Sequence, residues 1–344
     1  MLRILVGAIA LVSAYFAALL VIRLSNLWLL IFGSVVFAAI LRAIADPLVR
    51  RTRMNDGLAT LVAVLLVVAA VGGISTLFGQ TISHQVATLI ARIPAAWAAL
   101  QAQLASMPVT DQVLELLTNL TGQAGRALMS APKFATGFLS GVTTLVLVVV
   151  AGIYLALRPS ESREGVLAMA PISMRPRLRE VMNACGRALK GWLLAQLISM
   201  VLVGGLVALG LWLIGIPSPI ALGLLAGVSE FVPIVGPILS AVPGLLVAAV
   251  TGPEELALTL ALYIGVSQLE ANLIMPLVQR SVASLPVVLG IFAVVAMGGL
   301  FGPLGILFAT PAALVLYTAV TMLYRQDVLQ DEEAVAPGQP PRPR

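Results

Sequence analysis

The sequence is poor in charge and in the residues that build metal sites and disulfides. Its 344 residues include one cysteine, Cys185, and one histidine, His84, and only 10% of them are charged. A single cysteine excludes a disulfide within the chain, and these two residues cannot form a Cys/His metal cluster. The sequence also lacks a G-x-x-x-x-G-K-[S/T] phosphate loop, a G-x-S-x-G elbow and a dinucleotide fingerprint. We therefore expect no enzymatic activity, no cofactor and no metal site.

Apolar residues dominate what is present. They make up 60% of the chain, and the mean hydropathy is +1.05, which is more apolar surface than a soluble domain could bury. Crossing a hydrocarbon core of ~30 Å takes about 20 apolar residues in a helix, and several such tracts follow one another. The ten-residue alternation typical of β-barrels is absent from the sequence. The sequence therefore predicts an all-α polytopic membrane protein, whose surroundings are the lipid bilayer.

Six tracts are predicted to be full spans: 4–22, 27–45, 58–80, 137–157, 191–214 and 255–279. Two further tracts, from residue 215 to 250 and from 286 to 323, are interrupted by proline and glycine. The chain is thus divided into N-terminal transmembrane helices at 1–80, another transmembrane helix at 136–157 and a C-terminal core at 191–325. The first tract starts like a signal peptide, but it has no convincing small-x-small cleavage site, so we expect it to be retained.

Positive charge is distributed unevenly along the chain. If the N-terminus is cytoplasmic, sixteen of the 20 Lys and Arg residues fall on the inner side, and only Arg23, Arg92, Arg126 and Lys133 fall outside. Cytoplasmic loops of membrane proteins carry such an excess. The sequence predicts a multi-pass protein of the cytoplasmic (inner) membrane with both termini in the cytoplasm. Because the basic residues lie in short loops, we expect no nucleic acid as a partner.

Three segments outside the apolar tracts are predicted to be amphipathic or disordered and not to cross the membrane. Residues 81–135 carry apolar stripes at helical spacing and are predicted to form an extracytoplasmic amphipathic segment. This segment either packs on itself or on lipid, or it binds neighbouring protomers in a homo-oligomer. Residues 158–190 are predicted to form a cytoplasmic amphipathic helix. Residues 326–344, charged and then Pro-rich, are predicted to be a disordered cytoplasmic tail.

The two interrupted tracts resemble each other. PIALGLLA (219–226) and PVVLGIFA (286–293) are each followed by a Gly-Pro pair, Gly236-Pro237 and Gly302-Pro303. Proline removes a backbone donor and clashes with the preceding turn, so neither tract can continue as one regular helix. If each pair marks the tip of a re-entrant hairpin, the charge distribution requires one full crossing between the two tracts. The pattern then indicates an inverted repeat, a design shared by many secondary transporters.

The first interrupted tract also carries features of close helix packing. Gly223 and Gly227 form a small-x-x-x-small face that lets another helix approach closely. The backbone groups freed by Pro233 and Pro237 must be buried in protein or face a wet cavity, because in hydrocarbon each would cost several kcal/mol. We therefore expect this break to be enclosed by neighbouring helices.

Two carboxyl groups lie inside the apolar tracts. Glu230 is in the first interrupted tract, and Glu270 is in QLEANLIMP, flanked by Gln268 and Asn272. An ionised carboxylate at membrane depth is costly and is usually neutralised, paired or facing water. No Lys or Arg lies in either tract, so both glutamates are candidates for taking up a proton or a cation, with Gln268 and Asn272 as further coupling candidates. The alternative is a structural role, in which Glu230 caps the broken helix and Glu270 is a hydrogen-bonded carboxyl group.

With these residues the sequence resembles the autoinducer-2 exporter family, the PerM-like permeases of bacteria. The resemblance rests on GIPSPIALGLLAGVSEFVPIVGPILSAVP (215–243), QLEANLIMP (268–276) and GGLFGPLGILFATP (298–311), and the family's order of helices fits residues 1 to about 325. On that resemblance Glu230, Pro233 and Gly236-Pro237 fall on the family's Glu-Pro-Gly segment. Glu270 and Pro276 fall on its second acidic motif.

The resemblance implies secondary transport through a transport core at 191–325. The transported species would be a small polar metabolite or signal such as autoinducer-2, or sodium ions exchanged for protons. It also implies a homo-oligomer, with a pentamer as the candidate size. A membrane scaffold without transport activity is the remaining alternative, but a scaffold would tolerate glutamine at both glutamate positions.

Overall fold

The computed structural model of the protein describes residues 24–52, 54–69, 72–73, 146–232, 235–274, 285–331 and 333–339. Within these ranges every regular element is a helix. Four of the helices are long and apolar enough to cross a membrane: Leu27–Thr52, Ile172–Ile214, Pro253–Leu273 and Val287–Gln326. The predicted all-helical membrane class is confirmed. The number of spans, the orientation and the inverted repeat stay predictions, and the segment 81–135 lies outside the described residues.

The chain forms two compact units, and each unit is built from segments far apart in sequence. Unit 1 comprises Met1–Asp46, Thr144–Leu189 and Ser284–Arg344, and unit 2 comprises Pro47–Thr143 and Lys190–Ala283. One helix, α7 (Arg175–Ile214, 40 residues), contributes its first part to unit 1 and the rest to unit 2.

The segment 158–190 differs from the single amphipathic helix that the sequence predicts. It contains α6 (Pro159–Ala168), the short 3-10 helix η1 (Ile172–Met174) and the beginning of α7. No proline lies between Pro176, in the first turn of α7, and the end of that helix. Because nothing ends the helix near residue 190, the polar first part of α7 runs directly into the apolar part.

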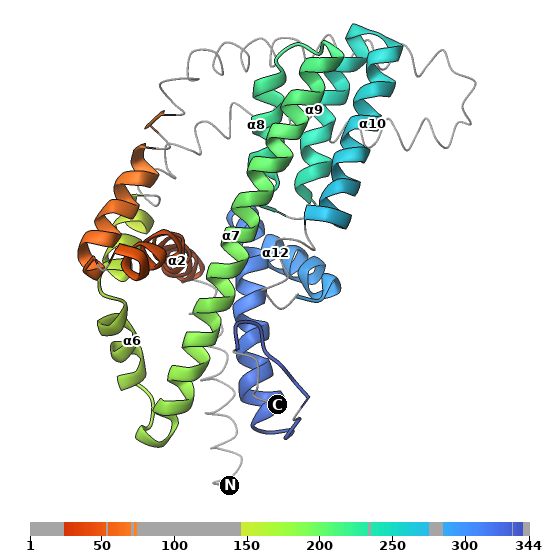
Figure 1. Ribbon diagram of the computed structural model, residues 1–344. Helices are drawn as coiled ribbons and strands as arrows, with labels where there is room; N and C mark the ends of the chain where they lie inside the picture. The colour runs from red at the N-terminus through yellow and green to blue at the C-terminus, as the bar shows by residue number, and fades with distance from the viewer. Residues whose placement is uncertain are drawn as a thin grey trace. The chain divides into compact units, whose positions relative to one another are not determined.

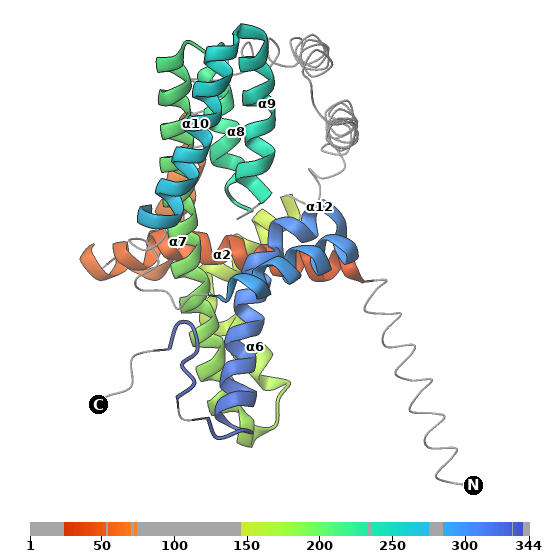
Figure 2. The ribbon, with the colours of Figure 1, turned by 90° about the vertical axis from the view of Figure 1, so that its right-hand side faces the viewer.

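The described core of unit 2 contains four helices that lie side by side. They are the second part of α7, α8 (Pro219–Ser229), α9 (Val235–Thr251) and α10 (Pro253–Leu269), as Figures 1 and 2 show. α8 and α10 each begin with a proline, which is tolerated there because the first turn of a helix does not use that N–H group. Their shared core consists of buried apolar residues, among them Val203, Val207, Leu211, Leu222, Ala226, Val247, Tyr263 and Val266.

Helices α7 and α8 approach closely because glycines line their contact. A Cβ atom added to Gly223 would lie 2.6 Å from the carbonyl oxygen of Gly204 and 2.5 Å from the Cβ of Ala208. A Cβ atom on Gly227 would lie 2.6 Å from the carbonyl oxygen of Met200. The predicted small-x-x-x-small face is therefore confirmed, and the helix that it admits is α7.

The first interrupted tract folds as two helices that pack against each other, α8 and α9. α8 ends at Ser229 and α9 begins at Val235, so the break falls between these residues. Gly236 and Pro237, which the sequence predicts to mark the tip, instead lie in the first turn of α9, where Gly236 packs against the Ser229 carbonyl. Proline is tolerated in a first turn, so Pro237 does not end the helix. Pro233 lies outside the described residues.

The second interrupted tract is helix α12 (Val287–Val320), which belongs to unit 1 and is broken at Gly302. Gly302 has φ 65° and ψ −150°, a conformation that other L-residues rarely adopt. Gly305 packs against the carbonyl of Met297, so the two legs of α12 are in contact beside the break. Figure 2 shows the two legs running in different directions.

The second leg of α12 contacts helix α2 (Ser25–Thr52) within unit 1. The rings of Phe32 and Phe308 meet edge to face with centroids 6.0 Å apart, and Gly33 leaves room for the same phenylalanine. The leg then ends in a π-helical turn, η3 (Thr321–Gln326).

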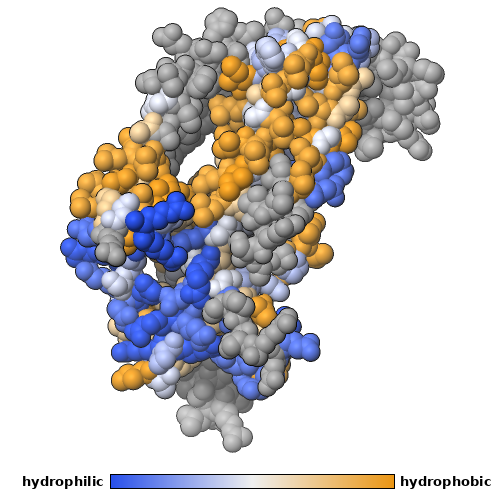
Figure 3. Space-filling model, viewed as in Figure 1, coloured by the Kyte–Doolittle hydropathy of each residue, from blue (hydrophilic) through white to orange (hydrophobic). Residues whose placement is uncertain are grey.

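Large apolar side chains are exposed on the helices of unit 2, among them Leu225, Val228, Ile238, Leu239 and Ile264. In Figure 3 hydrophobic residues cover much of the visible face of α8, α9 and α10. Hydrophilic residues instead gather around α6 and the first part of α7 in unit 1. Exposed apolar surface of this extent marks contact with lipid or with another protein, and it fits a chain whose composition calls for a bilayer.

The C-terminal tail is more ordered than the sequence predicts. Residues 327–331 and 333–339, here called the C-terminal strap, lie against the first part of α7, and Ala334 and Ala336 are 3% and 1% exposed. The prediction of disorder was wrong for these residues because side chains of α7 and η3 bond the segment at several points. Residues 340–344 lie outside the described ranges.

Candidate functional site

The two glutamates that the sequence singles out meet in unit 2. Glu230 follows the last residue of α8, and its backbone N–H donates to the carbonyl of Ala226 at 3.0 Å. Glu270 follows α10 as the first residue of the π-helical turn η2 (Glu270–Ile274). The two residues are 1% and 6% exposed, and their carboxyl groups face each other within hydrogen-bonding reach. We call these two groups the carboxyl pair.

Helix α7 contacts both members of the carboxyl pair. The Ser199 hydroxyl donates to Oε1 of Glu270 at 2.9 Å, and the Gln196 side-chain amide donates to the backbone carbonyl of Glu230 at 2.6 Å. Both α7 residues are buried. They lie three positions apart and therefore share one face of the helix. A single helix thus fixes the end of α8 and the end of α10 relative to each other.

Glu270 is also placed by the contact of α10 with α9. Tyr263 lies two turns before Glu270 on the buried face of α10, and its hydroxyl donates to the carbonyl of Ser240 at 3.2 Å. Gly244 makes room for this ring, since a Cβ there would lie 2.5 Å from the Tyr263 oxygen. Beyond Glu270 the helix continues as a π-helical turn, a feature that is often found at functional sites.

Among the described residues, no positively charged side chain is found against Glu230 of the carboxyl pair. The charged group that Glu230 faces is Glu270, and Oε2 of Glu230 is buried without a hydrogen-bond partner among the described residues. Two ionised carboxylates so close in a low-dielectric interior repel each other strongly, unless a proton or a cation lies between them. In the described ranges no group of three or more His, Cys, Asp or Glu lies together. A pair of facing carboxyl groups can in principle take up a proton or a hard cation.

Gln268 and Asn272 do not join the carboxyl pair. Both are exposed, and the Asn272 amide donates to the Gln268 carbonyl at 2.9 Å and to the Gln268 side-chain oxygen at 3.1 Å. Gln268 and Asn272 are each two positions from Glu270. Residues at that spacing point to different sides of a helix, so neither side chain lies on the side of Glu270. Their coupling role stays a prediction.

The predicted hinge residues fall in different parts of the chain. Gly236 and Pro237 lie in the first turn of α9 in unit 2, whereas Gly302 and Pro303 form the break of α12 in unit 1. Pro276 lies outside the described residues.

Ser199 and Gln196 are the site residues that sequence reasoning missed. The signal was present in LLAQLISM (193–200), where two polar side chains at helical spacing interrupt an otherwise apolar run. Such polar residues inside a membrane helix face the protein interior and its polar partners.

Comparisons with known proteins agree in pointing to transport. A family model described as AI-2E family transporter matches residues 4–325. The chain is 25% identical over 298 residues to YueF of Bacillus subtilis, covering 82% of this chain and 81% of YueF. It is 34% identical over 159 residues to YrrI of the same organism, covering 45% of this chain and 44% of YrrI. A Mycobacterium tuberculosis protein is 30% identical over 183 residues, covering 53% of this chain and 50% of that protein. All three are named as candidate transport proteins, and the last two alignments span half or less of those relatives.

Proposed function

Since the chain belongs to the AI-2E family of transporters, we propose that it is a gradient-driven secondary transporter whose carboxyl pair couples the movement of a proton or sodium ion to that of a small polar solute. One observation carries the proposal. Two buried carboxyl groups on different helices face each other, and one oxygen of Glu230 has no partner among the described residues.

The geometry suggests how ion binding would be converted into helix movement. Glu230 stands at the end of α8 and Glu270 at the end of α10, so a change of charge at the pair changes the force between these two helices. With a proton or cation between them the carboxyl groups attract each other, and without one they repel. Loss of the ion to water therefore favours separation of the helix ends, and this change would alter access to the site.

For the solute, the family description supports export of a small polar metabolite or signal such as autoinducer-2. Sodium/proton antiport is the second candidate function, and the oxygen atoms around the pair favour it. Besides the two carboxylates, the Ser199 hydroxyl lies at the site, where it is bonded to Glu270. Carboxylate, hydroxyl and carbonyl oxygens are the ligands that hard cations prefer.

The test uses purified full-length protein in liposomes that contain a pH-sensitive dye. An imposed sodium gradient should drive proton movement in the wild type if the chain is an antiporter. An imposed proton gradient should drive movement of autoinducer-2 if the chain is an exporter. Glu270→Gln keeps the shape and hydrogen bonding of the protonated form, so this variant should fold but lose gradient-driven flux of whichever kind the wild type shows.

Glu254→Gln is the matched control. It makes the same change near the other end of the helical stretch Pro253–Leu273, at an exposed carboxylate in the first turn of α10. We expect this variant to keep wild-type flux. Full gradient-driven flux in Glu270→Gln, or equal loss in both variants, would contradict a coupling role for the pair.

A further inference from the structure

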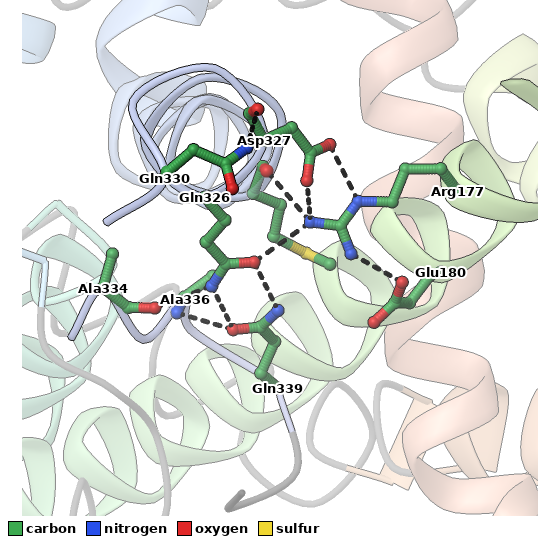
Figure 4. Close-up of polar contacts among 9 residues, drawn as sticks. Arg177, Glu180, Gln326, Asp327, Gln330, Ala334, Ala336 and Gln339 are labelled. Atoms are coloured by element: carbon green, nitrogen blue, oxygen red, sulfur yellow. Dashed lines mark hydrogen bonds and ion pairs between the residues drawn. The ribbon is translucent and has the colours of Figure 1, made fainter. Parts of the chain in front are cut away.

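The first residue of the C-terminal strap, Asp327, is bonded to one arginine of α7. The Arg177 guanidinium donates from Nε to one carboxylate oxygen of Asp327 at 2.9 Å and forms an ion pair with the other at 2.8 Å. It also donates to the Met322 carbonyl at 3.0 Å and to the Gln326 side chain at 3.1 Å, as Figure 4 shows. A cation at this place bonds the Met322 carbonyl near the C-terminal end of the helix, where basic side chains are favourable. Arg177 thus joins α7, η3 and the strap.

A second set of contacts fixes the far part of the strap. The side-chain amides of Gln326 and Gln339 bond to each other in both directions, at 2.9 and 3.1 Å. Gln326 also donates to the Ala334 carbonyl at 2.7 Å, and the Ala336 N–H donates to Gln339 at 3.0 Å (Figure 4). The two glutamines therefore fold the strap back toward η3.

The strap then reaches further along α7. Ala336 is buried in an apolar cluster with Val181 and Ala184 of α7 and Met322 of η3. The Arg187 side chain donates to the Gly338 carbonyl at 2.6 Å. Arg177 and Arg187 are ten positions apart, which is about 15 Å along a helix. The strap is thus attached at both ends of this stretch of α7.

The turn around Asp331, in the first part of the strap, is stabilised by its own contacts. Arg325 bonds the Asp331 carboxylate at 2.6 Å, which holds the pKa of that carboxyl group below its ordinary value. The other Asp331 oxygen accepts the backbone N–H groups of Glu333 and Ala334 at 3.2 and 3.1 Å. At neutral pH the turn therefore keeps a charged carboxylate at its centre.

We infer that the C-terminal strap is a latch for the second leg of α12, which holds the leg against α7 when docked and lets it swing about Gly302 when released. The leg begins at a break whose backbone conformation only glycine adopts readily and ends at η3, which Arg177 bonds through the Met322 carbonyl, while the strap is bonded to the same arginine through Asp327. Apart from the buried Ala334 and Ala336, the strap is held by polar contacts, several of them exposed, and segments with few buried apolar contacts open locally at low free-energy cost. This inference goes beyond the proposed function and does not use the carboxyl pair.

Gly338→Ala is the sharpest way to release the latch without changing charge. Gly338 has φ 73°, and an added Cβ would collide with the Ala184 carbonyl and lie 2.7 Å from the backbone nitrogen of Ala188. These are backbone atoms of α7, so no side-chain rotation can relieve the collision. Gly186→Ala is the matched control, because a Cβ at that position of α7 meets nothing within 4 Å.

The measurement is the distance between two spin labels in full-length protein, recorded by pulsed electron paramagnetic resonance. The labels are placed at Met174→Cys and Leu316→Cys in a Cys185→Ser background, at exposed positions before α7 and on the second leg of α12. The unmodified protein and Gly186→Ala should give one narrow distance distribution. Gly338→Ala should raise the population of longer distances several-fold.

A second pair of variants keeps the test decisive if Gly338→Ala fails to fold. Asp327→Asn removes the anchor of the strap on Arg177, whereas Glu180→Gln removes the other partner of the same arginine, which lies within α7. Only Asp327→Asn should broaden the distribution. An unchanged distribution in the strap variants, or equal broadening in the controls, would overturn the latch.

Discussion

Replacing Gly223 with alanine should force α8 away from α7 and lower the stability of unit 2. The added Cβ would stand 2.5 Å from the Cβ of Ala208, 2.6 Å from the Gly204 oxygen and 2.8 Å from the Ala208 Cα. Carbon atoms pack at about 3.5–4.0 Å, so the helices must separate by about 1 Å. None of these atoms can rotate away, and overpacking of this kind costs about 1–3 kcal/mol. That cost is about a 5- to 150-fold change in the folded-to-unfolded ratio.

The matched control is Gly205→Ala, one position from Gly204 on α7. A Cβ at Gly205 meets nothing within 4 Å, so this variant gains helix propensity without a collision. Both variants gain that propensity, and the difference between them therefore isolates the collision. Stability would be measured by reversible unfolding of the purified protein in mixed micelles, with tryptophan fluorescence as the signal. Equal unfolding midpoints for the two variants would refute the close contact of α7 with α8.

Three further predictions concern the site and the topology. Ser199→Ala removes the hydroxyl that donates to Glu270 and should lower flux in liposomes at unchanged thermal stability; wild-type flux would contradict a positioning role. Gly244→Ala crowds the ring of Tyr263 and should cost about 1–3 kcal/mol of unfolding free energy, whereas Gly265→Ala, whose Cβ meets open space, should cost nothing measurable. Single cysteines at 252–255 in a Cys185→Ser background should be labelled from outside, and labelling from the cytoplasm alone would exclude the proposed hairpins.

Much of the fold could be predicted because membrane solvation leaves few alternatives. The apolar tracts require helices, and the prolines and glycines of the two interrupted tracts require breaks. The glycine face of α8 was predictable for the same reason, since small residues at a spacing of four mark close helix contacts. These patterns do not predict the exact residue at which a helix breaks. The sequence predicted a break with Pro233 in it and a tip near Gly236-Pro237; in the structure the break lies between Ser229 and Val235, and Gly236-Pro237 lie in the first turn of α9.

The sequence predicts which residues carry charge at the candidate site, but it does not predict how these residues are arranged in space. Glu230 and Glu270 stand out because a carboxylate is costly in an apolar tract, but the sequence does not say that they meet. That encounter depends on how α8 and α10 pack against α7, which involves contacts between residues 71 positions apart, such as Ser199 and Glu270. Composition likewise failed for the strap, because proline content indicates disorder on average, whereas Arg177 and the two glutamines act at particular positions.

The break in α12 determines which chirality a residue at position 302 can have without strain. At Gly302 the backbone adopts φ 65° and ψ −150°, and an added Cβ there would meet nothing within 4 Å. The obstacle to another residue is therefore the handedness of the chain itself, since an L side chain strains this conformation by about 1–3 kcal/mol even where space is free. A D-alanine introduced by chemical ligation would fit the same position without that strain. Of the twenty encoded amino acids, only glycine is achiral, and only glycine adopts the Gly302 conformation without strain.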